Sequence, residues 1–145
     1  MIETVSENNI DELLPLMRAY QEFYKVADIA DAKNKEFFSQ FGEHNSAGCQ
    51  FIYRENEEVV GFATVYLTYT STIAAKVAIL NDLYTKPDAR GKGIGRRLIE
   101  HCHEFASSKG AKRLQWVTAP DNDKAQLLYD SMNTNKSTWC FYTYN

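Results

Sequence analysis

Three glycines alternate with basic and apolar residues in one short segment, Arg90-Gly91-Lys92-Gly93-Ile94-Gly95-Arg96. Glycine adopts positive φ angles without steric cost, so such a segment can turn successive backbone N–H groups toward one point. A helical period of apolar residues begins at Ile94, and the N-terminus of a helix attracts anions. Four side chains in this stretch and directly after it add positive charge, namely Arg90, Lys92, Arg96 and Arg97. The segment therefore predicts an anion site suited to phosphate or pyrophosphate.

Two well-known phosphate-binding patterns do not describe this segment. A Walker loop needs Gly-x-x-x-x-Gly-Lys-Ser/Thr, which the chain lacks. The dinucleotide fingerprint needs a third glycine where Arg96 stands, and it opens a strand–helix–strand unit, whereas the strands expected before this segment form a meander. A simple turn before a helix is the remaining alternative, but it would require neither three glycines nor the basic residues around them.

Asn81 and Asp82 interrupt an apolar run, Val77-Ala78-Ile79-Leu80, inside a predicted strand. Aspartate is disfavoured in strands, so two polar residues at this point indicate a bulge or a site. The carboxylate of Asp82 could bind a cationic amine or accept its proton. A structural hydrogen bond is the alternative interpretation.

The glycine segment resembles the acyl-CoA pyrophosphate loop, Gln/Arg-x-x-Gly-x-Gly/Ala, of the GNAT (GCN5-related) N-acetyltransferase superfamily. Pro87-Asp88-Ala89 resembles the residues that precede this loop, and Asn122-Asp123-Lys124-Ala125-Gln126-Leu127-Leu128-Tyr129 resembles the family's second motif, Asn-x-x-Ala-x-x-Phe/Leu-Tyr. The order of predicted elements agrees along nearly the whole chain. Locally, Leu80-Asn81-Asp82-Leu83-Tyr84 resembles the diamine acetyltransferases, with Asn81 in place of the first of two acids.

The resemblance implies acetyl-CoA as the cofactor. Backbone N–H groups from Gly91 to Arg96 would hold its pyrophosphate, strand residues Leu83 and Thr85 would pair with the pantetheine arm, and Asn122 would hydrogen-bond that arm. The full set of implied cofactor-binding residues is Leu83, Tyr84, Thr85, Arg90, Gly91, Lys92, Gly93, Ile94, Gly95, Arg96, Asn122 and Tyr129.

The resemblance also implies the catalytic and acceptor residues. Tyr129 would lie near the thioester sulfur as the general acid, and Asp82 would bind or deprotonate the amine; a core tyrosine is the alternative for Tyr129. A backbone N–H of the splayed strand would stabilise the developing oxyanion. The implied substrate-binding residues are Tyr20, Glu22, Tyr24, Asn81 and Asp82, where Tyr20 and Tyr24 could equally be core residues and Glu22 a solvated one.

The periodicity predicts the elements that position these residues. Helical spacing starts at Ile10 and recurs at 33–41, 94–106 and 122–132, while β-rich segments lie at 2–5, 50–54, 59–69, 76–85, 113–118 and 138–144. Three consecutive strands with short links form an antiparallel meander, and the later strand–helix–strand order favours a parallel crossover. We expect an α+β fold of GNAT type: a mixed, mostly antiparallel sheet with helices on both faces and a splay between the fourth and fifth strands.

Length and charge set the remaining expectations. The 145 residues suit a single domain, 1–145, and the formal charge of −3 argues against nucleic acid or a membrane surface as partners. The three widely spaced cysteines form no C-x-x-C pair, so we expect no metal site and reduced thiols in a cytoplasmic protein.

Together these observations predict an acetyl-CoA-dependent N-acetyltransferase. The expected partner is a small-molecule primary amine, cationic and polyamine-like, and a homodimer is compatible with the resemblance. Two alternatives stay open: a protein lysine or N-terminal acetyltransferase, and a non-catalytic acyl-CoA-binding module.

Overall fold

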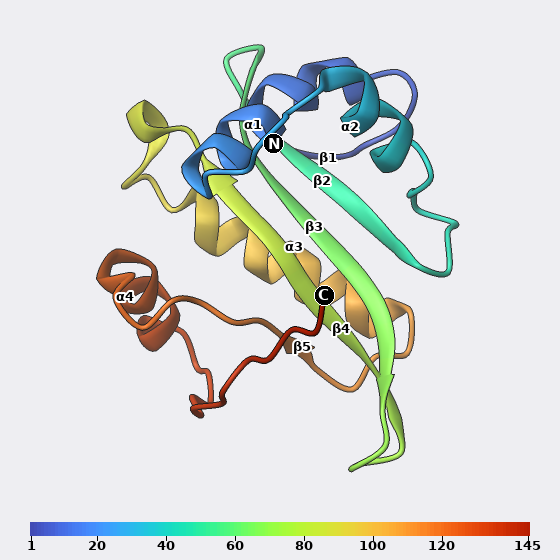
Figure 1. Cartoon of the computed structure of the whole chain (residues 1–145), viewed down its shortest axis with the longest axis vertical. Helices are drawn as coiled ribbons and strands as arrows, with labels where there is room; N and C mark the ends of the chain where they lie inside the picture. The colour runs from blue at the N-terminus through green and yellow to red at the C-terminus, as the bar shows by residue number, and fades with distance from the viewer.

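A computed structural model describes all 145 residues as one five-stranded sheet with four α-helices (Figure 1). The elements in chain order are β1 (Ile2–Thr4), α1 (Ile10–Phe23), α2 (Asp31–Phe38), β2 (Gly48–Glu55), β3 (Glu58–Thr70), β4 (Ala75–Thr85), the 3-10 helix η1 (Pro87–Ala89), α3 (Ile94–Ser108), β5 (Leu114–Gln115) and α4 (Asp123–Ser131). The strands lie in the order β1-β2-β3-β4-β5, antiparallel except for the parallel pair β4–β5. The predicted α+β, mostly antiparallel mixed sheet is confirmed.

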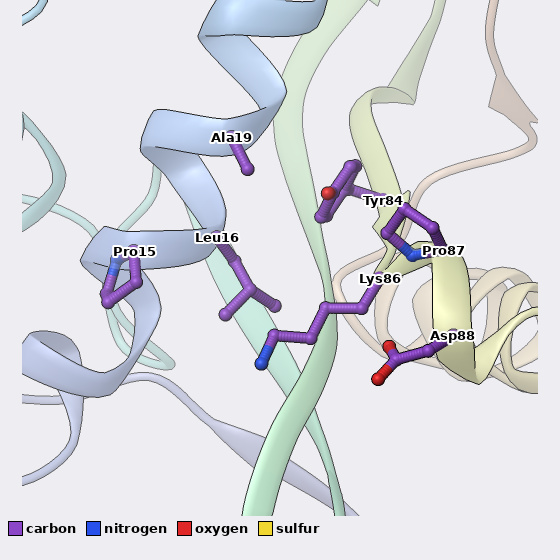
Figure 2. A pocket seen from close by; sticks show the side chains of 7 residues that line it. All are labelled: Pro15, Leu16, Ala19, Tyr84, Lys86, Pro87 and Asp88. Carbon is purple, nitrogen blue, oxygen red and sulfur yellow. The ribbon is translucent and has the colours of Figure 1, made fainter.

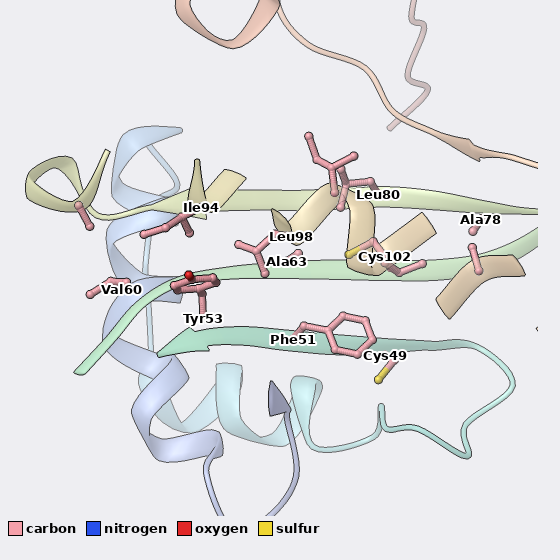
Figure 3. Packing of buried hydrophobic residues seen from close by; sticks show 14 residues of the cluster. Cys49, Phe51, Tyr53, Val60, Ala63, Ala78, Leu80, Ile94, Leu98 and Cys102 are labelled. Atoms are coloured by element: carbon pink, nitrogen blue, oxygen red, sulfur yellow. The ribbon is translucent and has the colours of Figure 1, made fainter. Parts of the chain in front are cut away.

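Each face of the sheet has its own apolar core. Helix α3 buries a stripe at Ile94, Leu98 and Cys102 against side chains of β2–β4, and Figure 3 shows these residues beside Phe51 and Ala63. Helices α1 and α2 cover the opposite face around Leu13, Phe38, Ile52 and Phe62. Alternate residues of a strand point to opposite faces, which is why neighbours such as Phe62 and Ala63 belong to different cores.

Strands β4 and β5 separate after a short contact. Their only register pairs are Ala78–Leu114 and Ile79–Gln115, while β4 continues to Thr85. Residues 80–85 of β4 therefore have no strand neighbour on that side. This is the predicted splay, and it leaves backbone groups of β4 available to an extended ligand.

The structure differs from the sequence prediction in three segments. The helix expected at 33–41 is Asp31–Phe38, and the strand expected at 113–118 is only Leu114–Gln115. The predicted strand 138–144 is wrong: residues 133–145 form no regular element, and four of their aromatic side chains are 85–105% exposed, Trp139, Phe141, Tyr142 and Tyr144. A strand needs a neighbour for its N–H and C=O groups, and the two-residue β5 pairs with β4 alone, so β-propensity was insufficient here.

No helix in the structure combines the length and apolar character that crossing a membrane requires.

Candidate active site

The glycine loop, residues 90–96, joins η1 to the start of α3. Gly91 and Gly93 have φ angles of +81° and +80°, a region that other residues rarely adopt, and Gly93 is the N-cap of α3. No backbone N–H from Gly91 to Arg96 donates a hydrogen bond within the protein, and Arg97 is the first to find an acceptor, the carbonyl of Gly93 at 3.1 Å. An added Cβ at Gly91 or Gly93 would meet nothing within 4 Å, so the space beside these free donors is open. This is an anion cradle made of backbone.

The basic side chains near the loop are partly occupied by protein partners. Arg90 donates through Nε to the carbonyl of Thr85 at 2.8 Å, and its guanidinium lies 5.7 Å from the ring centroid of Tyr84. Lys92 pairs with Glu55 at 3.1 Å, and Arg97 donates to the Tyr53 hydroxyl at 2.8 Å. Arg97 is thus held at strand β2. The side chains supply a positive field, while the directed donors of the loop come from the backbone.

Gly95 lies where the glycine loop at the start of α3 packs against α4, which contains the second sequence motif, residues 122–129. A Cβ at this position would lie 3.2 Å from Leu128 Cδ2 on α4, so glycine permits the close approach of α3 and α4. Arg96 adds a hydrogen bond of 2.6 Å to the Ser131 hydroxyl. Asn122 caps α4, because its side-chain oxygen accepts from the Ala125 N–H at 3.4 Å. The nitrogen of that amide makes no hydrogen bond within the protein and is free to donate.

A β-bulge in β4 decides where Asp82 points. Thr64 pairs with Asp82 and the next residue of β3, Val65, pairs with Leu80, so Asn81 is the extra residue. Without the bulge, Leu80 and Asp82 would share a face. With it, Leu80 stays in the α3 core, whereas Asp82 lies opposite Thr64 on the face covered by α1 and α2. The bulge, one of the two interpretations that the polar pair allowed, is present.

Asp82 is only 7% exposed and is surrounded by hydrogen-bond donors. Burial raises the pKa of its carboxyl above the ordinary value, and hydrogen bonds from Thr64, Tyr20 and Asn81 partly offset that rise. The Asn81 amide donates to Asp82 Oδ1 at 3.1 Å. A buried carboxylate of this kind is a better proton acceptor than an exposed one.

Aromatic side chains border Asp82 from α1 and the sheet. The Tyr20 ring lies 5.0, 5.6 and 6.2 Å from the rings of Tyr24, Phe62 and Tyr84. Burial and the Asp82 carboxylate raise the pKa of Tyr20, and the same two causes raise the pKa of Tyr66 to about 12. These phenols stay protonated at neutral pH.

The structure brings some of the predicted acceptor residues together and separates one. Tyr20, Tyr24 and Asp82 gather at the C-terminal end of α1. Glu22 is exposed and takes no part in these contacts, since a residue two positions beyond Tyr20 projects about 200° around the helix.

Tyr129 lies on α4 beside Trp116, with ring centroids 5.3 Å apart. Burial raises its pKa, with a smaller contribution from Tyr24. Its hydroxyl makes no hydrogen bond within the protein and therefore remains available as a donor. A half-buried, protonated phenol is a chemically suitable acid.

Sequence reasoning missed Gln50 and Thr64, two buried polar side chains in the row that contains Asp82. Gln50 Nε2 donates to Thr64 Oγ1 at 3.0 Å, and Thr64 faces Asp82 on the next strand. The available signal was a polar residue in each of two apolar strands. Strand register, which brings them together, cannot be read from either strand alone.

An open hollow of about 310 Å³ lies between α1 and the end of β4 (Figure 2). Its lining comes from Pro15, Leu16, Ala19, Tyr84, Lys86, Pro87 and Asp88. Tyr84 joins this hollow to the aromatic group around Tyr20, but neither Asp82 nor Tyr129 lines it. It is therefore adjacent to the candidate site and does not coincide with it.

The matching family model, two related sequences and a similar crystal structure are all of acetyltransferases. Residues 13–133 match the model of the "Acetyltransferase (GNAT) family". The chain is similar to an uncharacterised N-acetyltransferase, YhfO, of Bacillus subtilis, at 36% identity over 126 residues covering 87% of this chain and 83% of that protein. It is also similar to the thialysine N-epsilon-acetyltransferase of Bos taurus, at 29% identity covering 95% of this chain and 85% of that protein. A crystal structure described as a probable acetyltransferase superposes with a TM-score of 0.85 at 26% identity, covering 100% of this chain and 97% of the other.

Proposed function

This chain belongs to the GNAT acetyltransferase family, whose members transfer acetyl from acetyl-CoA to an amino group, and we propose that its acceptor is a small cationic primary amine. The observation that carries this proposal is Asp82, a carboxylate 7% exposed and bordered by the tyrosines Tyr20 and Tyr66. Carboxylates and aromatic faces are the groups that bind alkylammonium ions. The similarity to a thialysine acetyltransferase supports the same class of substrate.

The residues present fit acetyl-CoA. The free N–H groups from Gly91 to Arg96 and the open space beside the two positive-φ glycines suit a pyrophosphate. The side of β4 without a strand neighbour at Leu83–Thr85 suits an extended amide-containing arm, although the Thr85 carbonyl already accepts a hydrogen bond from Arg90. The Asn122 amide nitrogen supplies one more donor. When bound, acetyl-CoA supplies the activated acetyl group as a thioester.

The chain has one residue to accept the proton of the amine and another to donate a proton to the departing sulfur. An alkylammonium ion with a pKa near that of lysine, about 10.4, must lose a proton before it attacks. Asp82, with its raised pKa, accepts that proton directly or through water. Tyr129, with a free hydroxyl and a raised pKa, donates to the departing sulfur. A backbone N–H of β4 beside the splay stabilises the negative charge on the carbonyl oxygen.

The cysteines and the family match support two further parts of this proposal. The three cysteines are free and two are buried, as expected of a protein in the reducing cytoplasm. The family match over residues 13–133 supports one catalytic domain spanning 1–145.

A thiol-release assay across a panel of acceptors tests the proposal. The panel contains polyamines, lysine and its analogues, aminoglycosides, neutral amino acids and lysine peptides. We expect turnover with small dicationic amines, and we expect Asp82→Asn to reduce it selectively. Turnover with peptides alone would move the acceptor class to proteins, and acetyl-CoA binding without any turnover would indicate a non-catalytic module.

A further inference from the structure

Three buried polar side chains form a row across the centre of the sheet: Gln50 on β2, Thr64 on β3 and Asp82 on β4. Thr64 is the register partner of both Gln50 and Asp82, so all three lie side by side on the face covered by α1 and α2. Their exposed fractions are 1%, 0% and 7%. Buried polar groups are costly unless they are paired, so a row of three requires a physical reason.

The donors in this row have a defined direction. Gln50 Nε2 can only donate, and it donates to Thr64 Oγ1 at 3.0 Å. A threonine hydroxyl carries one hydrogen, and with Gln50 on its oxygen that hydrogen is free for Asp82. Thr64 is the direct cross-strand neighbour of Asp82, and hydrogen bonding from Thr64 is the largest of the effects that lower the pKa of the Asp82 carboxyl. The direction of donation therefore runs from Gln50 through Thr64 to the carboxylate.

One atom of the row has no hydrogen-bond partner. Gln50 Oε1 is the buried side-chain polar atom that has no hydrogen-bond partner. Turning the amide over would let Oε1 accept the Thr64 hydrogen, but that hydrogen would then point away from Asp82. Leaving a buried acceptor unpaired costs about 1–3 kcal/mol. The turned amide would leave the buried Nε2 donor unpaired instead, so both orientations carry a cost of this kind. They differ in the Thr64 hydrogen, which only the observed orientation leaves free to reach Asp82.

We propose that Gln50 is a positioning residue of the acceptor site: its amide directs the Thr64 hydroxyl toward Asp82 and thereby fixes the carboxylate that receives the substrate amine. The inference rests on the proposed function, because it assumes that Asp82 binds the amine. The groups that face Asp82 are Tyr20 from α1, Tyr66 and Thr64 from β3, and Asn81 from β4. None is charged at neutral pH, so hydrogen bonds alone oppose the effect of burial.

A second buried amide provides a matched control. Asn34 on α2 is 6% exposed, and its side chain exchanges two hydrogen bonds with Gln21 on α1, at 2.8 and 2.9 Å. This pair joins the two helices that cover the row and makes no hydrogen bond to Asp82. Asn34→Leu should therefore lower stability without altering the carboxylate, as a purely structural amide would.

The experiment measures the pKa of Asp82 by NMR titration of the carboxyl carbon, together with KM for the amine and for acetyl-CoA. The variants are Gln50→Met, Thr64→Val, Thr64→Ser and Asn34→Leu. Loss of a hydrogen bond to the ionised form raises a carboxyl pKa. We expect Gln50→Met and Thr64→Val to raise the pKa of Asp82 and to increase KM for the amine about 3- to 10-fold, the scale of one hydrogen bond. KM for acetyl-CoA should not change, and Thr64→Ser should restore wild-type values.

The outcomes separate this inference from the function on which it rests. If Gln50→Met and Thr64→Val leave the pKa of Asp82 where it is and only lower the melting temperature, as Asn34→Leu does, the positioning role is refuted. If the pKa of Asp82 rises but KM for the amine stays constant, Gln50 and Thr64 do act on the carboxylate through hydrogen bonds, and Asp82 does not bind the acceptor. Should Gln50→Met fail to fold, Gln50→Leu removes the same Nε2 donor and tests the same step, while the Thr64→Val and Thr64→Ser pair tests the Thr64 hydroxyl.

Discussion

The glycine loop and the polar row across the sheet are the two proposed binding regions, and they offer opposite kinds of binding groups. The loop, residues 90–96, is contiguous, largely exposed and built from free backbone N–H groups. The row of Gln50, Thr64 and Asp82 is buried, comes from three strands and acts through side chains. Backbone donors tolerate most side-chain changes that preserve φ, whereas a buried side-chain network depends on each of its members. The two regions should therefore respond differently to mutation.

The largest expected effect is the loss of acetyl-CoA binding in Gly93→Glu. The substitution forces a residue with a Cβ to φ +80° and places a carboxylate in the anion cradle. Gly110→Glu is the matched control, because Gly110 has φ +84° and open space but lies at the other end of α3. Calorimetric titration should detect no binding in Gly93→Glu and wild-type affinity in Gly110→Glu. Retained affinity in the first variant would exclude the loop as the pyrophosphate site.

Tyr129→Phe should lower kcat about 10²- to 10⁴-fold, the usual contribution of a general acid. Because the pKa of Tyr129 is raised, the wild-type enzyme should keep this acid protonated beyond the ordinary range of a phenol. Tyr69→Phe, on an exposed strand position, serves as the control. Steady-state kinetics that show an unchanged kcat would return Tyr129 to a packing role beside Trp116.

Asp82→Asn should raise KM for the amine about 10- to 100-fold, the range of a charge-assisted hydrogen bond, and change acetyl-CoA affinity little. The physical reason is that the proposed acceptor site contains the Asp82 carboxylate, whereas the proposed cofactor site is the separate glycine loop, residues 90–96. Initial rates with each substrate varied in turn check this. An equal loss of affinity for both substrates would mean that Asp82 supports the sheet and not the acceptor site.

Asp82 should also make stability depend on pH. Its pKa in the folded state is raised above 3.8, so the folded protein binds more protons than the unfolded chain between the two values. The free energy of unfolding should therefore fall as pH rises through that window, by about 1.4 kcal/mol for each unit of pKa difference. Urea unfolding across pH should show this slope in the wild type and not in Asp82→Asn. The same slope in both proteins would assign it to other groups.

The smallest effect is expected for Lys92→Met. Lys92 forms an exposed ion pair with Glu55, and exposed pairs contribute about 0–1 kcal/mol. If the backbone binds the pyrophosphate, the dissociation constant for acetyl-CoA should rise less than about 5-fold, the same energy scale. Calorimetry at constant ionic strength measures this. A loss comparable to that of Gly93→Glu would show that side-chain charge dominates the loop.

Sequence reasoning succeeded where the signal is local. The glycines at 91 and 93, the helix that follows them and the meander before them are all encoded within a few residues of one another. It failed at 138–144, where a strong β-propensity has no neighbouring strand to pair with. It also grouped Glu22 with Tyr20 and Tyr24, although helical geometry places Glu22 on another side of α1.

The sequence by itself determined the glycine loop before α3, the order of most of the elements and the presence of an unusual polar pair at residues 81 and 82. Only the tertiary structure decided which face Asp82 occupies, because one extra residue in β4 reverses the alternation of side chains after Leu80. Only the tertiary structure also brings Gln50 and Thr64 together. They are 14 positions apart in the chain, but Gln50 Nε2 lies 3.0 Å from Thr64 Oγ1 across β2 and β3. Local conformation follows from neighbouring residues, whereas a buried network follows from strand register, which depends on both cores of the sheet.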